Sequence, residues 1–456
     1  MLYQTINPYT EHLVQTFPLH TDGEIETIIA KAETVYATDW SRRPLAARKA
    51  VVKKAASILR DDVERYAKLS TLEMGKLFRE ARSEVGLCAD ILDYFADNAD
   101  AFLAPEKLPV RNGEAFIENA PLGVLFCIEP WNYPYYQLVR VAAPNLMLGN
   151  TIICKHAPNV PKCALAFEKL FLDAGAPEGT WTNVFATNEQ AAQIIADGRI
   201  RGVALTGSER AGSAVASEAG QALKKSTMEL GGSDPFIVLD DADLDTAVEL
   251  AVFGRMKNAG QTCIAAKRFI VPESMADAFL DGFKAGFEKL QPGDPMDPET
   301  SLAPLCTDGA LNSVLNQIDT AVIRGAKVLL GGKKLDQRGF FLAPTILVDV
   351  KPDNPAYRQE FFAPVAMVFR VKSDEEAVQL ANDSPFGLGA TVIAKDIERA
   401  KRVARQIESG MVFINEVTGT AADLPFGGVK NSGYGRELSH LGIGEFVNKK
   451  LIRVAA

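Results

Sequence analysis

The sequence predicts an α/β protein whose strands form parallel sheets. From residue 123 to residue 219, short apolar runs of strand length alternate with longer segments whose apolar residues recur at helical spacing. The same rhythm resumes at residue 234. Strands that alternate with helices in this way pair in parallel through right-handed crossovers. A chain of 456 residues is also long enough for two or three domains.

The predicted elements follow one another along the whole chain. Residues 23–100 are predicted to be helical, since Ile25, Ile28 and Ile29 begin a series of apolar residues at helical spacing. Residues 108–119 change to a strand and turn pattern, which predicts a hairpin or arm. The tail, 446–454, alternates like a strand and is expected to pair outside the main sheets. The strands predicted between these ends, each followed by a helix, are 123–128, 151–154, 183–186, 202–206, 234–239 and 266–271.

Composition excludes several classes of protein. The net charge is −9 with no basic block, so nothing indicates a nucleic-acid partner. The longest apolar runs are shorter than a membrane span, and the start of the chain has no cationic segment followed by an apolar one. We therefore expect a cytoplasmic protein without a membrane partner. Six scattered cysteines without a CxxC pair, and four histidines without ligand spacing, predict reduced thiols and no metal.

Cys263 is the main candidate for a reactive group. It follows the small or polar residues 260–262 and precedes an alternating run through Phe269 and Val271 that predicts a strand. A loop between a helix and a strand is a good place to expose a nucleophile. The alternative is a small core residue, because unpaired cysteines are among the most buried residue types.

Two further candidates follow the first strands of the parallel pattern. Asn132 follows a predicted strand, and Pro134 is expected in the first turn of the next helix, so the Asn132 amide would lie near a helix N-terminus, where donors suit an oxyanion. Lys155 is predicted at the carboxyl end of a buried strand, the edge where parallel sheets bind ligands. The alternatives are a turn anchored by Trp131 and a solvated lysine.

Two more candidates follow the later strands. Gly207 and Ser208 form a tight turn before a predicted helix, whose first N–H groups suit a phosphate. Glu229 ends an apolar stretch before two glycines, where partial burial would raise the pKa of its carboxyl group toward that of a useful base. A helix cap or an ion pair would explain Glu229 equally well.

Taken together, these residues resemble the NAD(P)-dependent aldehyde dehydrogenase superfamily. The resemblance runs from about residue 7 to residue 452, in the order and spacing of that family. The motifs that carry it are Trp131-Asn132, Lys155, Gly207-Ser-Glu-Arg-Ala-Gly212, Glu229-Leu-Gly-Gly, Gly260-Gln-Thr-Cys263, Gln359-Glu-Phe-Phe-Ala-Pro364, Asn415 and Pro425-Phe-Gly-Gly-Val-Lys-Asn-Ser-Gly.

The resemblance implies two Rossmann-like doubly wound parallel-sheet domains and a small β oligomerisation element. The cofactor-binding domain would comprise residues 1–107 and 121–229, and the catalytic domain residues 230–428. The oligomerisation element would comprise residues 108–120 and 446–456. An exposed strand of this kind is an aggregation hazard unless another subunit pairs with it, so we expect a homodimer or a homotetramer.

The resemblance also implies a two-step oxidation. The Cys263 thiolate would attack an aldehyde carbonyl, and the side chain of Asn132 with the backbone N–H of Cys263 would hold the oxyanion. After hydride transfer a thioester would remain, and Glu229 would act as the general base on the water that releases the acid.

Further positions match the cofactor ligands of that family. Lys155 would bind the adenosine ribose, the turn at Gly207 and Ser208 the pyrophosphate, and Glu360 the nicotinamide ribose. Phe362 would pack beside the nicotinamide ring, and Trp131 belongs to the same set of cofactor positions.

Pro158 bears on the choice of cofactor. In many NAD-preferring relatives a glutamate occupies this place, three residues after the lysine, and in NADP-preferring ones a small hydroxyl residue occupies it. Pro158 offers neither device. The sequence therefore predicts use of NAD, with NADP also accepted.

Within the superfamily, the chain resembles the bacterial succinate-semialdehyde dehydrogenases. Arg140 matches an arginine that binds the substrate carboxylate there, and Lys257 falls where a second basic group is often found. Tyr136 and Arg140, four residues apart, are expected on one helix face, and Phe426 would complete the pocket. The partner would be a small aldehyde with a terminal carboxylate.

Two departures qualify this narrower resemblance. Ala265 stands where some members carry a second cysteine, and Thr418 and Thr420 are the nearest hydroxyl residues to a substrate-binding serine of other members. Oxidation of a neutral or aromatic aldehyde is the main alternative, with Tyr133 and Tyr135 as further wall residues. A member that transfers the acyl group to CoA, and a binding protein without chemistry, are further alternatives that the retained catalytic set disfavours.

Overall fold

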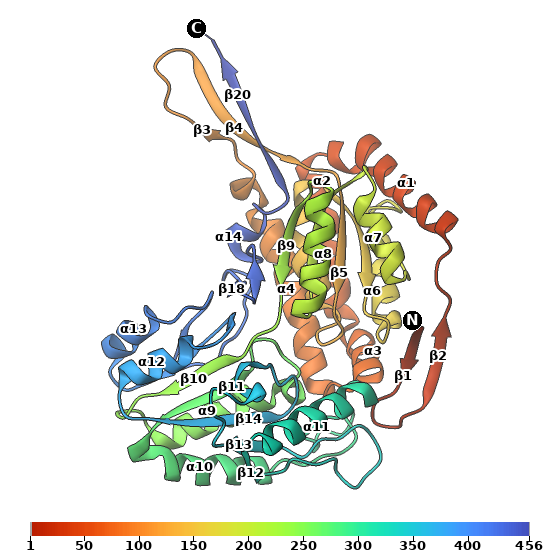
Figure 1. Ribbon diagram of the computed structural model, residues 1–456. Helices are drawn as coiled ribbons and strands as arrows, with labels where there is room; N and C mark the ends of the chain where they lie inside the picture. The colour runs from red at the N-terminus through yellow and green to blue at the C-terminus, as the bar shows by residue number, and fades with distance from the viewer. Residues whose placement is uncertain (1, 456) are drawn as a thin grey trace.

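Two large sheets organise the computed structural model, which describes residues 2–455 (Figure 1). The first sheet has six strands in the order β19-β9-β8-β5-β6-β7, and all of its neighbours are parallel except β19 and β9. Because β6 and β8 flank β5 on opposite sides, the sheet is doubly wound, as predicted. Its strands are β5 (Val124–Glu129), β6 (Thr151–His156), β7 (Trp181–Asn183), β8 (Ile200–Thr206), β9 (Lys225–Glu229) and β19 (Gly433–Tyr434).

Both faces of the first sheet are buried. Side chains alternate along β5, so that Leu125 and Cys127 join one hydrophobic cluster while Val124 and Phe126 join another. Such strands show as continuous apolar runs, which is why they were predictable. The helices between them are α5 (Tyr136–Leu148), α6 (Pro161–Asp173), α7 (Asn188–Ala196) and α8 (Glu209–Gln221).

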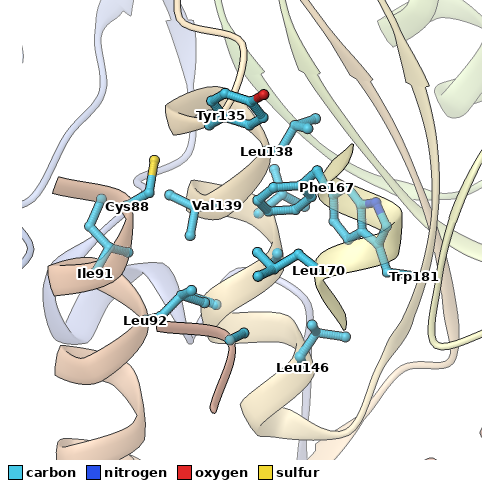
Figure 2. Close-up of a cluster of buried hydrophobic side chains, with 14 of the residues drawn as sticks. Cys88, Ile91, Leu92, Tyr135, Leu138, Val139, Leu146, Phe167, Leu170 and Trp181 are labelled. Atoms are coloured by element: carbon cyan, nitrogen blue, oxygen red, sulfur yellow. The ribbon is translucent and has the colours of Figure 1, made fainter. Parts of the chain in front are cut away.

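Helix α5 is buried along its whole length, because it lies between the helical opening of the chain and the sheet. Figure 2 shows this core, in which Leu138 and Val139 of α5 lie among Leu92 of α4, Leu170 of α6 and Trp181 of β7, with further labelled side chains around them. The core fixes α5 against the sheet, and with it the segment that enters the helix at residue 136.

Two predicted boundaries were wrong. Helix α5 begins at Tyr136, so Pro134 precedes the helix instead of opening it. The strand predicted for residues 183–186 is Trp181–Asn183, because the Trp181 side chain fills the core, with its ring centroid 5.0 Å from that of Phe167.

The second sheet has seven strands in the order β12-β13-β14-β11-β10-β16-β17. Only β12 and β13 run antiparallel, so this half is also a parallel α/β sheet. Its strands are β10 (Asp234–Val238), β11 (Ala266–Pro272), β12 (Lys327–Leu330), β13 (Thr345–Val348), β14 (Val365–Val371), β16 (Thr391–Ile393) and β17 (Phe413–Ile414).

Helices cover both faces of the second sheet as well. Phe236 and Phe269 pack against α9 and α10 on one face, whereas Ile237 and Ile270 pack against α12 and α13 on the other. The elements of this half are α9 (Leu244–Met256), η2 (Lys257–Gly260), α10 (Glu273–Glu288), α11 (Asp308–Ile323), η3 (Pro355–Arg358), α12 (Asp374–Asn382) and α13 (Ile397–Ala404).

The helical opening matches its prediction. Thr21 and Glu24 form a capping box at the start of α1, and Ile25 and Ile29 are buried on one face of that helix. The elements are α1 (Asp22–Thr38), η1 (Trp40–Arg42), α2 (Leu45–Asp61), α3 (Val63–Met74) and α4 (Phe78–Phe102), preceded by the hairpin of β1 (Tyr3–Ile6) and β2 (Leu13–Phe17).

An arm projects from the body and carries the C-terminal end of the chain (Figure 1). Strand β20 (Val447–Val454) pairs antiparallel with β4 (Glu114–Pro121), which pairs in turn with β3 (Glu106–Lys107). The tail thus pairs outside the main sheets, as predicted. The remaining short elements are β15 (Phe386–Gly387), β18 (Val429–Lys430) and α14 (Ser439–Gly442).

None of the helices within residues 2–455 is long and apolar enough to cross a membrane.

The core of Figure 2 predicts a position-dependent loss of stability. Leu170 of α6 is fully buried, whereas Leu165 of the same helix is 39% exposed. We expect Leu170→Ala to lower the free energy of the first unfolding transition in urea by about 2–5 kcal/mol, because it leaves a cavity, and Leu165→Ala to lower it by less than about 0.5 kcal/mol. Equal losses in the two variants would show that this core does not limit unfolding.

Candidate active site

The first sheet presents four of the predicted residues at one edge. Its parallel strands place Ile128 opposite Lys155 and Leu205, and Thr206 opposite Glu229. The segments that follow β5, β6, β8 and β9 therefore leave from the same carboxyl edge, where open α/β sheets bind ligands. Asn132, Lys155, Ser208 and Glu229 belong to these segments or strand ends.

Cys263 lies between η2 and β11, in the turn that the sequence predicted. Before it, Asn258, Ala259 and Gly260 all have positive φ angles, of 54°, 51° and 75°. A Cβ atom on Gly260 would lie 2.4 Å from the carbonyl oxygen of Ala363, so only glycine fits there. Left-handed backbone at Asn258 and Ala259 is costly, and such strain often marks a functional loop.

Hydrogen bonds from the first sheet hold this loop. The Asn132 side chain, which is 3% exposed, donates from Nδ2 to the carbonyl oxygen of Gln261 at 3.1 Å. Asn258 Nδ2 donates to the carbonyl oxygen of Asn132 at 2.9 Å and to that of Gln261 at 3.1 Å. Asn132 is therefore joined directly to the segment that carries Cys263, and its second Nδ2 hydrogen remains available to a ligand.

Cys263 opens into a cavity of about 970 Å³. The thiol is the only one of the six cysteines that is not buried, and all six are free. Tyr133 Oη lies 3.0 Å from the hydroxyl of Thr262 and forms part of the wall beside the thiol. The other polar or aromatic residues of the wall are Arg79, Glu80, Ser83, Glu84, Tyr136, Gln137, Asp245, Glu249, Phe253, Lys257, Lys289, Ser301, Thr418, Thr420 and Phe426.

The surroundings of Cys263 favour the neutral thiol in the free protein. Burial raises the pKa of Cys263 to about 12, and the positive charges of Lys267 and Arg140 oppose that rise. A general base is therefore needed to make the thiolate near neutral pH. Within the described residues, no acceptor bonds the backbone N–H of Cys263, so this donor is free beside the thiol.

Glu229 is a buried carboxylate at the end of β9. Its side chain is 2% exposed, and neither carboxylate oxygen has a hydrogen-bond partner among the residues described. Burial, followed by the negative charge of Glu437, raises the pKa of Glu229 well above its ordinary value. The helix-cap and ion-pair alternatives for this residue are thus not what the structure shows.

The cofactor positions fit an anionic dinucleotide. Lys155 is 5% exposed, and its ammonium forms no hydrogen bond or ion pair with any residue in the described range. Burial lowers the pKa of Lys155, a cost that a bound phosphate or ribose would offset. Ser208 caps α8 and is exposed, so the first N–H groups of that helix after Gly207 face solvent.

The second group of cofactor positions comes from both halves of the chain. The rings of Trp131 and Phe362 meet edge to face, with 5.7 Å between their centroids. Glu360 accepts a hydrogen bond from the Gly232 N–H at 3.1 Å and pairs with Lys267 at 3.0 Å. Trp131, Phe362 and Glu360 therefore lie across the junction of the two sheets.

Arg140 differs from its predicted place. Its guanidinium is 1% exposed, pairs with Glu437 at 2.8 Å and donates to Thr206 at 3.0 Å. The guanidinium carbon lies 4.8 Å from the Tyr136 ring centroid and 4.6 Å from that of Phe426. Tyr136 and Arg140 share a helix face, as predicted, but only Tyr136 and Phe426 line the cavity. Arg140 lies behind them.

Lys257 is the predicted cation that does line the cavity. Its side chain is exposed, and within residues 2–455 it has no ion-pair partner. Although the residue is exposed, packing around its ammonium lowers the pKa of Lys257. The carboxylates of Glu80 and Glu84, which also line the cavity, oppose this shift, and the charge of Lys76 adds to it. An anion entering the cavity would meet this ammonium without breaking an existing pair.

Sequence reasoning missed three contributors to the site. Glu437 was not singled out, because its contact with Arg140 spans nearly 300 positions. Lys267 follows the nucleophile on β11 and had no visible partner in the sequence. Glu84 accepts the backbone N–H groups of Tyr135 and Tyr136 at 2.9 and 3.1 Å, so it caps α5 from another helix. A metal site is absent from the described residues.

Comparison with known proteins agrees with this geometry. The profile of the aldehyde dehydrogenase family matches residues 1–452. The chain is 50% identical over 451 residues to succinate-semialdehyde dehydrogenase [NADP(+)] of Deinococcus radiodurans, covering 99% of this chain and 94% of that one. It is 46% identical to the probable succinate-semialdehyde dehydrogenase [NADP(+)] of Synechocystis, over the full length of both chains.

A solved structure shares the whole fold. The crystal structure of succinic semialdehyde dehydrogenase from Streptococcus pyogenes in complex with NADP+ superposes with a TM-score of 0.98 at 48% identity, and the match covers 100% of both chains. The family profile, these relatives and the shared fold identify the protein: the chain belongs to the aldehyde dehydrogenase family.

Proposed function

We propose that the protein oxidises succinate semialdehyde to succinate with NADP+ and water. The observation that carries this proposal is that Cys263 and Lys257, whose ammonium has no ion-pair partner among the described residues, line the same cavity. Relatives that are 46–50% identical over the whole chain carry the name of this activity. We propose that the domain built on the first sheet, residues 1–107 and 121–229, holds the cofactor. The domain built on the second sheet, residues 230–428, would hold the nucleophile.

Cys263 begins the reaction as the nucleophile. Its sulfur adds to the aldehyde carbon, and the carbonyl oxygen becomes an oxyanion. The free backbone N–H of Cys263 and the second Nδ2 hydrogen of Asn132 are the donors available to that oxygen. Asn132 is held by Gln261 and Asn258, so little reorganisation is needed when charge develops.

Glu229 completes the reaction as the base. The bound nicotinamide supplies the hydride acceptor. The thioester left on Cys263 is released when a water attacks its carbonyl carbon and a base accepts the proton of that water. The Glu229 carboxylate, which has no hydrogen-bond partner among the described residues, suits that task. Because burial raises the pKa of Glu229, the carboxylate holds a proton more strongly than an ordinary glutamate does.

We propose NADP+ as the preferred cofactor, which revises the expectation from Pro158. The ammonium of Lys155 is nearly buried and has no anionic partner among the described residues. The extra phosphate of NADP+ would be such a partner. Pro158 carries no charge to repel that phosphate.

For the substrate, we propose Lys257 as the main ligand of the distal carboxylate. Arg140, the first candidate from the sequence, would have to leave Glu437 to bind it, and a buried glutamate left without its cation is costly. Tyr136 and Phe426 form the aromatic wall, and the Tyr136 hydroxyl lies 2.7 Å from that of Thr420.

We propose that the arm joins a second copy of the chain in a homodimer or homotetramer. Strand β20 is the edge of its sheet, and Leu451 and Val454 on it are 60% and 50% exposed. Six free thiols also suit the reducing cytoplasm, which we propose as the location.

The chemical roles predict two separable defects. Cys263→Ala should abolish turnover but keep NADP+ binding, whereas Glu229→Gln should give one burst of reduced nicotinamide absorbance in stopped flow and then stall. Cys306→Ala, at a buried cysteine, is the control that should keep turnover. Near-normal turnover in Cys263→Ala would contradict the assignment.

In the wild type, hydrolysis of the thioester should become faster as pH rises through the raised pKa of Glu229, because only the carboxylate accepts a proton.

The cofactor proposal predicts a selective loss at Lys155. Lys155→Met should weaken NADP+ binding by roughly tenfold or more, because one charge-assisted hydrogen bond is lost, and should weaken NAD+ binding less. Lys169→Met, at an exposed lysine of α6, is the matched control. Isothermal titration measures both affinities. A wild type that binds NAD+ more tightly than NADP+ would restore the expectation drawn from Pro158.

The substrate proposal predicts a contrast between two cations. Lys257→Met should lower kcat/KM toward succinate semialdehyde by roughly 10- to 150-fold and leave butanal nearly unchanged. Arg140→Met should lower kcat/KM toward both aldehydes by a similar factor, because it leaves the buried Glu437 without its cation. The reverse pattern would make Arg140 the carboxylate ligand. Equal wild-type kcat/KM for the two aldehydes would favour the neutral-aldehyde alternative.

A further inference from the structure

Lys267 is a buried cation that the reaction as described does not use. It is the second residue of β11, four positions after Cys263, and its side chain is 0% exposed. Its ammonium donates to the carbonyl oxygen of Thr262 at 2.8 Å and to that of Cys263 at 2.5 Å, and it pairs with Glu360 at 3.0 Å. An ammonium has three N–H groups, so these three acceptors satisfy it and fix its direction.

The contacts of Lys267 bring three segments together at the Cys263 carbonyl. Glu360, from the segment before β14, also accepts the N–H of Gly232, which follows β9. A Cβ atom on Gly232 would lie 2.6 Å from the Cys263 carbonyl oxygen, so the backbone after the base packs directly against the nucleophile loop. The Glu360 carboxylate is thus held by donors from two segments, and one of these donors also holds the nucleophile.

The charge of Lys267 reaches the thiol. Among the groups that lower the pKa of Cys263, Lys267 has the largest effect, and Glu360 acts in the opposite direction. A change in how strongly Glu360 neutralises Lys267 therefore changes the field at the sulfur.

We propose that Lys267 is a positioning residue that couples Glu360, at the cofactor side of the site, to the Cys263 loop. By fixing the carbonyls of Thr262 and Cys263, it directs the Cys263 N–H and thiol into the cavity. By pairing with Glu360, it presents that carboxylate to the cofactor. The inference rests on the proposed function only in that Glu360 meets the cofactor.

The matched control is the next residue on the strand. Arg268 is also 0% exposed, but it points to the other face of β11, where it donates to the carbonyl oxygens of Ala381, at 2.9 Å, and Leu380. Loss of either cation removes bonds to two backbone carbonyls, so a purely structural role predicts similar effects for Lys267→Met and Arg268→Met. Lys267→Gln keeps N–H donors without the charge, in case the methionine variant does not fold.

The test measures the thiol and the cofactor separately. The first readout is the rate at which iodoacetamide alkylates Cys263 as a function of pH, in enzyme without aldehyde, with Cys263→Ala as the blank. Because the pKa of Cys263 lies far above neutral pH, the variants are compared by their alkylation rates at the same pH values below it. We expect Lys267→Met and Lys267→Gln to slow alkylation about tenfold at each of these pH values, and Arg268→Met to leave the rate unchanged.

The second readout is the Kd for NADP+. We expect Lys267→Met to weaken binding by about fivefold to tenfold. We also expect the double variant Lys267→Met/Glu360→Gln to bind NADP+ no more weakly than the more affected of the two single variants, because both changes remove the same ion pair. The proposal would be overturned if a folded Lys267 variant had the same alkylation rates and the same Kd for NADP+ as Arg268→Met. It would also be overturned if the affinity losses of Lys267→Met and Glu360→Gln added fully in the double variant. Neither readout needs an aldehyde, so a failure to oxidise succinate semialdehyde would contradict the proposed function alone.

Discussion

Two hydrogen bonds across the junction of the two sheets, and a third within the Cys263 loop, hold the site together. Asn132 follows a strand of the first sheet and Gln261 precedes the nucleophile, and the Asn258 side chain bonds to the backbone of both. Each bond contributes only about 1 kcal/mol to stability, so their main effect is on direction. An oxyanion donor is useful only if the nucleophile stands at the correct distance from it. The left-handed backbone at Asn258 is what turns that side chain toward Asn132.

The cations of the site fall into two groups. Lys76, Arg140 and Lys267 each pair with a glutamate that is buried or half-buried, namely Glu84, Glu437 and Glu360. Such pairs add little net stability, but breaking one is costly, so they keep their elements in register. Lys155 and Lys257 have no such partner within the described part of the chain. The two groups separate the cations that hold the structure from those left free for anionic ligands.

The extent of sequence prediction follows from the range of each signal. Strands β5, β6, β8, β10 and β11 were predicted because burial on two faces makes a continuous apolar run, as in 124–129. The start of α5 was misplaced because its cap is Glu84, which lies on a helix more than fifty residues earlier. Cys263 and Glu229 became candidates through local motifs, which the sequence alone displays. The partner of Arg140 was not, because no local pattern links it to Glu437.

The strand pairing of the first sheet also constrains how the chain folds during synthesis. Strand β9 has β8 on one side, but its other neighbour, β19, lies about two hundred residues later in the sequence. At roughly 5–20 residues per second, the ribosome takes on the order of ten to forty seconds to reach it. During that interval the edge of β9 that carries Glu229 is open. The first sheet is therefore complete only when nearly the whole polypeptide has emerged, and the nascent chain has to shield a bare parallel edge until then.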